Sequence, residues 1–168
     1  MNDGRNPTTT PDWEELVADA GEIAAEYREN GWDAVVLEPI DVTPVDRTDR
    51  SGLDVTIAES AYDRVANLVG SEDVSFGDAE VYYRPPEAED EDRRFALVVE
   101  RDERSKSAVL VPVTYALSAS REVFERALHD EDLQIHVRPE AADEWIVFSH
   151  DDPSLFLEES DVREWTDG

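Results

Sequence analysis

The chain contains no cysteine and no long hydrophobic run. The lack of cysteine among its 168 residues excludes disulfide bonds and thiolate metal sites. No apolar stretch approaches the roughly 20 residues that a helix needs to cross a bilayer. The first residues, MNDGRNPTTTPDW, lack the charged-then-apolar pattern of a secretion signal. We therefore expect a soluble cytoplasmic protein with no membrane partner.

Glycine is sparse, and the motifs built on it are missing. The seven glycines form neither of the phosphate-binding patterns G-x-G-x-x-G and G-x-x-x-x-G-K. The nucleophile motif G-x-S-x-G is absent as well. Nucleic-acid binding would need a basic stripe, whereas the arginines are dispersed among acids. We expect no cofactor and no nucleic-acid partner, and we favour a non-enzymatic function over an enzymatic one.

Negative charge dominates what is present. Forty-three acidic residues against fifteen basic ones give a net charge of −28, and Lys106 is the single lysine. Such a charge destabilises the compact state by self-repulsion in dilute buffer. The repulsion fades in molar salt, where the Debye length is about 3 Å. Because acids occur along the whole chain, we expect a halophilic protein. The alternative, an acidic decoy for a basic partner, would require concentrated charge.

The hydrophobic pattern alternates between helices and strands. A Thr-Pro-Asp start signal at residues 10–12 and apolar residues three and four apart predict an amphipathic helix over 11–30. Apolar segments such as FALVV and AVLVPV predict strands joined mostly by hairpins. The sequence thus predicts an α+β fold with a largely antiparallel sheet and helices on one face. We expect one domain over 11–158, between a disordered N-terminus (1–10) and an acidic tail (159–168).

Two short segments of the sequence are similar. VTIAESA (55–61) and VTYALSA (113–119) agree at five positions, and each runs from a predicted strand into a predicted helix. The order strand, helix, strand, strand recurs over 53–102 and 107–152. An internal duplication explains this order, and so does one α+β pattern used twice. The sequence leaves both open.

Two arginines end predicted strands just before prolines. If the chain is duplicated, Arg84 and Arg138 occupy equivalent strand ends, with Tyr83 and His136 beside them. These four side chains would then be candidates for binding an anionic ligand in a cleft between the two units. The alternative, which we favour, is that each arginine pairs with surface acids where proline stops the strand.

The segment SHDDP is a candidate cation site. His150, Asp151 and Asp152 could hold a hard cation through their carboxylates. We favour the alternative that Asp152 caps a short helix beginning at Pro153.

The last predicted hairpin argues against a metal site built on histidine. If Arg138 pairs with Glu144, His136 lies opposite Ile146 and His150 lies about 13 Å away at the rise of a strand. One metal ion cannot bridge that distance. The same register predicts a shared apolar face made of Leu133, Ile135, Val137, Trp145 and Val147.

The segments AAEYRENGWDAVVLEPIDVTP and HVRPE…FSHDDP resemble a family of small acidic haloarchaeal cytoplasmic proteins with no assigned activity. The resemblance implies no substrate and no site residue. Our leading expectation is a non-enzymatic binding module that self-associates, as a homodimer, through a sheet edge or the tail, or that binds an unidentified protein partner. The alternative is a small anionic-ligand sensor or enzyme with a cleft between the two strand-helix-strand-strand units.

Overall fold

The computed structural model describes residues 11–46, 51–70, 74, 76, 78–84, 93–141 and 144–157. The expected disordered N-terminus and acidic tail therefore lie outside the described residues. Along the chain the elements are α1 (Pro11–Glu29), β1 (Asp33–Val36), β2 (Asp41–Asp46), β3 (Ser51–Ile57), α2 (Glu59–Val69), β4 (Asp78–Arg84), β5 (Arg93–Asp102), β6 (Ser107–Ala116), α3 (Leu117–Asp130), β7 (Leu133–Pro139), β8 (Ile146–His150) and a 3₁₀ helix, η2 (Pro153–Phe156).

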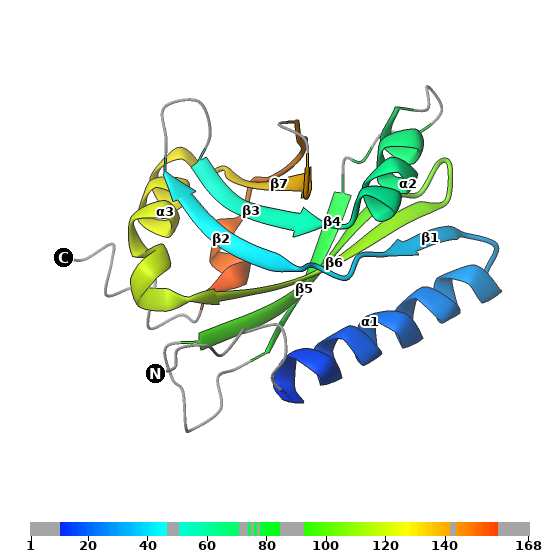
Figure 1. The fold of residues 1–168 in the computed structure, drawn as a ribbon, viewed down its shortest axis with the longest axis horizontal. Helices are drawn as coiled ribbons and strands as arrows, with labels where there is room; N and C mark the ends of the chain where they lie inside the picture. The colour runs from blue at the N-terminus through cyan, green and yellow to red at the C-terminus, as the bar shows by residue number, and fades with distance from the viewer. Residues whose placement is uncertain are drawn as a thin grey trace.

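The strands form two mixed sheets of four strands each. The first has the order β1-β6-β5-β4 and the second β2-β3-β7-β8. The pairs β1–β6 and β3–β7 are parallel, and the other four pairs are antiparallel. The α+β class and the N-terminal helix are thus confirmed. The strands divide between two sheets that pack face to face, with α2 and α3 near opposite ends of the second sheet (Figure 1).

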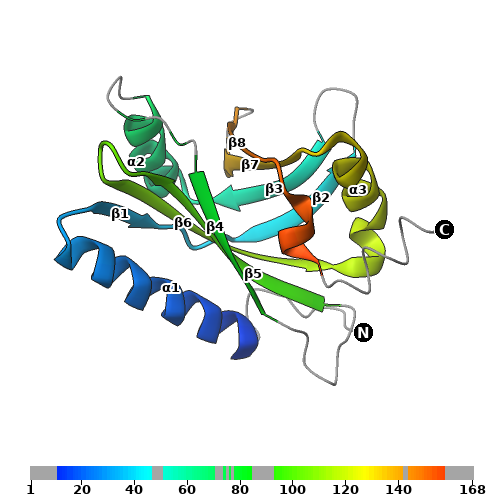
Figure 2. The ribbon, with the colours of Figure 1, turned by 180° about the vertical axis from the view of Figure 1, so that it is seen from behind.

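Helix α1 covers the side of the first sheet that faces away from the second (Figure 2). Its stripe begins at Trp13 and continues through Leu16, Ala20 and Ala24, all buried against β5 and β6. The helix ends at Glu29, and the turn that follows contains Gly31, whose φ of +86° is a conformation that suits glycine. No helix among the described residues has the length and apolar character needed to span a membrane.

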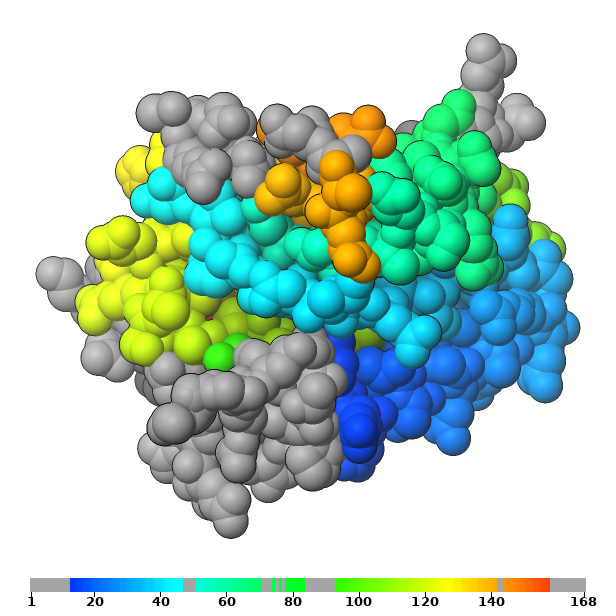
Figure 3. Space-filling view, viewed as in Figure 1, coloured from blue at the N-terminus to red at the C-terminus, as the bar shows by residue number. Residues whose placement is uncertain are grey.

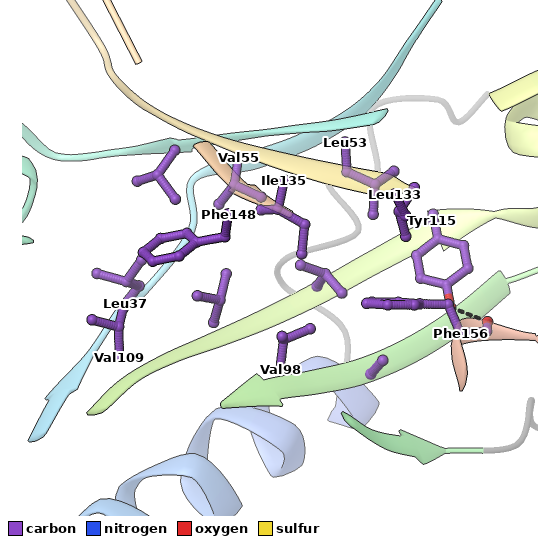
Figure 4. Close-up of a cluster of buried hydrophobic side chains, with 14 of the residues drawn as sticks. Leu37, Leu53, Val55, Val98, Val109, Tyr115, Leu133, Ile135, Phe148 and Phe156 are labelled. Atoms are coloured by element: carbon purple, nitrogen blue, oxygen red, sulfur yellow. Dashed lines mark hydrogen bonds between the residues drawn. The ribbon is translucent and has the colours of Figure 1, made fainter. Parts of the chain in front are cut away.

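The larger core lies between the two sheets (Figure 4). Alternate residues of every central strand point into it, and α2 and α3 add Tyr62, Val65 and Phe124. The Tyr115 hydroxyl donates a hydrogen bond to the Phe156 carbonyl, which ties η2 to β6. Burying each large apolar side chain contributes about 1.5–3 kcal/mol, so this core is the main source of stability.

The register predicted for β7 and β8 is wrong by one residue. Leu133 pairs with His150, Ile135 with Phe148 and Val137 with Ile146. A one-residue slip moves every side chain of a strand to the other face. Both faces of the segment carry apolar residues, so its pattern alone does not fix the register. As a result His150 points into the core, whereas Val147 is 44% exposed.

The order strand, helix, strand, strand occurs twice, as β3-α2-β4-β5 and β6-α3-β7-β8. The pairings of the two series differ. Strand β3 pairs in parallel with β7, whereas β6 pairs antiparallel with β5. An internal duplication stays a prediction.

Candidate functional site

The two sheets leave a cavity of about 380 Å³ between their edge strands β4 and β8. We call it the inter-sheet cavity. Its volume lies within the usual range for small-molecule sites. The lining residues come from β4, β5, β8 and η2 and from the segments before β4, before β7 and after β8: Phe76, Asp78, Ala79, Val81, Glu100, Asp132, Ser149, His150, Asp151, Asp152 and Leu155.

A buried acid–histidine pair joins the two sheets at the wall of this cavity. Glu100 lies on β5, at a position that alternation places on the inner side of the first sheet with Val98. His150 ends β8 on the inner side of the second sheet. The His150 Nε2 and Glu100 Oε2 atoms are 2.6 Å apart, and the two side chains are 5% and 4% exposed. The pair is therefore almost fully removed from bulk water.

The hydrogen bonds of His150 determine where its protons are. Its Nδ1 lies 3.1 Å from the carbonyl oxygen of Leu133. A carbonyl only accepts, so Nδ1 carries a hydrogen in this bond. A neutral imidazole then has a lone pair on Nε2, and the contact with Glu100 needs one proton between the two atoms. The pair is therefore either a protonated Glu100 with neutral His150 or an ion pair, and both forms share one proton.

The electrostatics of the pair agree with this shared proton. Burial raises the pKa of Glu100 above 4.5, against the opposing effect of His150. Burial alone would lower the pKa of His150, but the hydrogen bond and charge of Glu100 outweigh it and raise that pKa above 6.5. Both groups hold protons more tightly in the folded protein than in the unfolded chain. Perturbed titrations in a cavity are typical of functional sites.

Apart from His150, the charged residues that line the cavity within the described chain are all acids. Asp132, Asp151 and Asp152 are exposed to solvent at its mouth. Asp78 lies 3.6 Å from the Arg101 guanidinium, so part of its charge is already compensated. In the described part of the chain no group of three or more His, Asp or Glu side chains is arranged to hold a metal ion. The cavity can therefore accept the hydrogen bonds and charge of an organic cation.

The shared proton makes stability dependent on pH, because folding raises both pKa values. Below pH 6.5 the contribution of His150 is complete, and it is lost as the pH rises through the pKa of the folded protein. We expect the free energy of unfolding to fall as the pH rises from 6.5 through the raised pKa of His150, by about 1.4 kcal/mol for each unit by which folding raises that pKa. In Glu100→Gln the amide can still donate to Nε2 but does not titrate, so this fall should shrink. Urea unfolding of both proteins across this range measures the difference. Parallel curves would contradict the shared proton.

The structure brings together the residues predicted as a cation site. His150, Asp151 and Asp152 line one cavity, although no metal-ligating group is formed there. Asp152 precedes η2 without a side-chain cap on the backbone. Instead it accepts a hydrogen bond from the Ser154 hydroxyl.

His136 and Arg138 lie on the outer face of the second sheet, away from the cavity. Asp54, on the neighbouring strand β3, lies 3.1 Å from His136 Nδ1 and 3.3 Å from an Arg138 guanidinium nitrogen. The Trp145 ring meets His136 edge-on, with ring centroids 6.5 Å apart. Figure 3 shows residues of the segment between β7 and β8, in orange, beside β2 and β3 on this face. Arg138 thus pairs with an acid of its own sheet.

The other two anion-site candidates lie in the first sheet. Tyr83 is on β4 and lines a separate cavity near α1. The side chain of Arg84 lies outside the described residues. The structure therefore does not bring Tyr83 together with His136 and Arg138.

Two site residues were missed by reasoning from the sequence. Glu100 directly follows the apolar run FALVV, and Asp54 is the one acid in GLDVTI; both are buried. An isolated acid at a core position of a strand is rarely tolerated without a partner. That pattern was the available signal. The partners, His150 and His136, are distant in sequence.

No curated protein matches this chain, and neither does any solved structure. The model of one protein family, described as a family of unknown function (DUF7529), matches residues 3–158, almost the whole chain. The chain therefore belongs to this family of unknown function.

Proposed function

We propose that this protein is a non-enzymatic binding module that takes a small organic cation, such as a diamine, in the inter-sheet cavity. The observation that carries the proposal is the Glu100–His150 pair at the wall of a cavity whose remaining charged lining is acidic. A buried carboxyl with a raised pKa gains most from a cationic partner, because the partner compensates the charge that burial disfavours.

The geometry also fits the way in which an ammonium group donates hydrogen bonds. An ammonium group has three N–H donors. The shared proton of the pair makes only the one hydrogen bond between Glu100 and His150. A ligand ammonium that replaced this proton could donate to the Glu100 carboxylate and to Nε2 of His150. The exposed acids at the mouth, Asp132 and Asp152, then suit a second ammonium group of the same ligand.

Calorimetric titration with 1,4-diaminobutane tests the proposal, with the uncharged 1,4-butanediol as its matched probe. We expect the diamine to bind and the diol to bind at least tenfold more weakly. Asp132→Asn and Asp152→Asn should each weaken the diamine by about tenfold, the size of one charge-assisted hydrogen bond. Asp63→Asn, at an exposed position of α2, is the control and should bind as the parent does. Equal binding of diamine and diol would refute the proposal.

Two expectations from the sequence accompany this proposal. The charge of −28 supports a protein that works in concentrated salt, and full stability in dilute buffer would count against it. Self-association is supported by the edge strands β4 and β8, which carry the exposed side chains of Tyr82 and Val147. A light-scattering mass of 19.0 kDa in molar KCl, the mass of one chain, would contradict it.

A further inference from the structure

A second cavity, of about 440 Å³, lies between helix α1 and the edge strand β4. We call it the α1–β4 groove. Helix α1 packs over β1, β6 and β5. The face of β4 on the same side of the sheet therefore lies next to the helix and not beneath it. Leu97 of β5 is 1% exposed and underlies the groove, while Leu16 and Ile23 line it from α1. Tyr82 lines it from β4 and is 44% exposed.

The width of this strip limits what can occupy it. Neighbouring strands are about 4.8 Å apart, so the part of the sheet beside α1 is about one strand wide. A second helix packed against α1 would need about 8–10 Å between the axes. The volume instead lies in the range of small-molecule sites, which is about 300–1,000 Å³. A small ligand therefore fits better than a partner helix.

The charged residue Glu22 and the ring of Tyr82 favour a positively charged ligand in the groove. Glu22 of α1 is exposed and lines the groove with Tyr82. The Tyr82 hydroxyl donates a 2.8 Å hydrogen bond to Glu80, which raises its pKa to about 12. The ring therefore stays un-ionised, and its bond to a carboxylate enriches its electrons. Such a ring attracts cations at its face.

The same face of the sheet already holds a cation in this way. The guanidinium carbon of Arg101 lies 5.9 Å from the ring centroid of Tyr27 and 5.5 Å from that of Trp32. Arg101 also forms an ion pair with Glu80, the carboxylate that accepts the Tyr82 hydroxyl. The Glu80 carboxylate thus contacts both Arg101, which already lies against two aromatic rings, and Tyr82, whose ring is exposed.

We propose that the α1–β4 groove binds a small organic cation with an aromatic or aliphatic body. The cationic head lies over the Tyr82 ring near Glu22, and the apolar body lies on Leu16, Ile23 and Leu97. A second copy of the chain is disfavoured as the occupant of the groove, because the strip of sheet beside α1 is only about one strand wide. The site is separate from the inter-sheet cavity, and its ligand is apolar along one side.

The test uses 2-phenylethylammonium and its uncharged analogue 2-phenylethanol, titrated into the whole protein and followed by calorimetry. We expect the ammonium to bind at least tenfold more tightly than the alcohol. Tyr82→Leu keeps an apolar side chain but removes the ring, and it should weaken the ammonium about two- to fivefold. Glu22→Gln should weaken it to a similar extent at low salt. Glu14→Gln, an exposed position on the same helix, is the matched control.

The outcomes separate this site from the inter-sheet cavity. Asp132→Asn and Asp152→Asn should leave the affinity for 2-phenylethylammonium unchanged, and 1,4-diaminobutane should not displace it. Equal affinity for the ammonium and the alcohol would overturn the inference. So would unchanged affinity in both Tyr82→Leu and Glu22→Gln, or loss of binding in the two asparagine variants.

Discussion

His150→Ala should lower the free energy of unfolding by about 3–5 kcal/mol, the usual cost of removing one member of a buried ion pair. The substitution leaves Glu100 in the core without the group that holds its Oε2 atom. It also removes the edge-on contact between His150 and the Phe156 ring, whose centroids are 5.7 Å apart. Urea unfolding in molar KCl measures the loss, since urea leaves the ionic strength constant.

Two companion variants separate the charge from the packing. Glu100→Gln keeps a hydrogen bond to Nε2 and should cost less than His150→Ala. The double variant Glu100→Met and His150→Leu replaces the pair by apolar groups of similar volume. Such replacements are often neutral or stabilising by about 1–4 kcal/mol. A loss below about 1 kcal/mol in His150→Ala would show that the pair is not buried as described.

Gly52→Ala should prevent stable folding, with a loss above about 4 kcal/mol, a size that only severe steric or core changes reach. A Cβ atom at Gly52 would lie 1.9 Å from the carbonyl oxygen of Gln134, on the paired strand β7. Its φ of +146° is also a conformation that side chains other than glycine rarely adopt. The clash falls on the parallel β3–β7 pairing, which joins the two hairpins of the second sheet. Far-ultraviolet circular dichroism and urea unfolding would register the loss.

Gly21→Ala is the matched control for this prediction. Gly21 lies within α1, and a Cβ atom there would meet nothing within 4 Å. The same change of residue should therefore stabilise the protein by about 0.5–1 kcal/mol, through the higher helix propensity of alanine. If the two alanine variants were equally stable, the close approach of β3 to β7 would be refuted.

Local patterns in the sequence were sufficient to predict α1. The start signal and the apolar spacing of three and four predicted a helix over residues 11–30, and the helix spans Pro11–Glu29. These signals act within one or two turns of chain, so they do not depend on partners elsewhere. The α+β class followed for the same reason.

The candidate site depends on pairings that local patterns do not contain. Glu100 and His150 are 50 residues apart and belong to different sheets. The division of strands between sheets is set by long-range packing, and the register of β8 by which of its two apolar faces is buried. With the predicted register, His150 would have lain outside the core. The site therefore became visible only in three dimensions.

The mixing of strands between the sheets has a consequence for biosynthesis. In the first sheet β1 pairs with β6, and in the second β3 pairs with β7, so each sheet joins an early strand to a late one. When translation has reached only the turn after β5, the first sheet still lacks β6 and the second still lacks β7 and β8. Contacts of such long sequence separation slow folding and make it cooperative. All strands of the first sheet exist once β6 has been translated, whereas β2 and β3 wait for β7 and β8. Until then the unpaired edge of β3 is the part of the growing chain most exposed to wrong pairing.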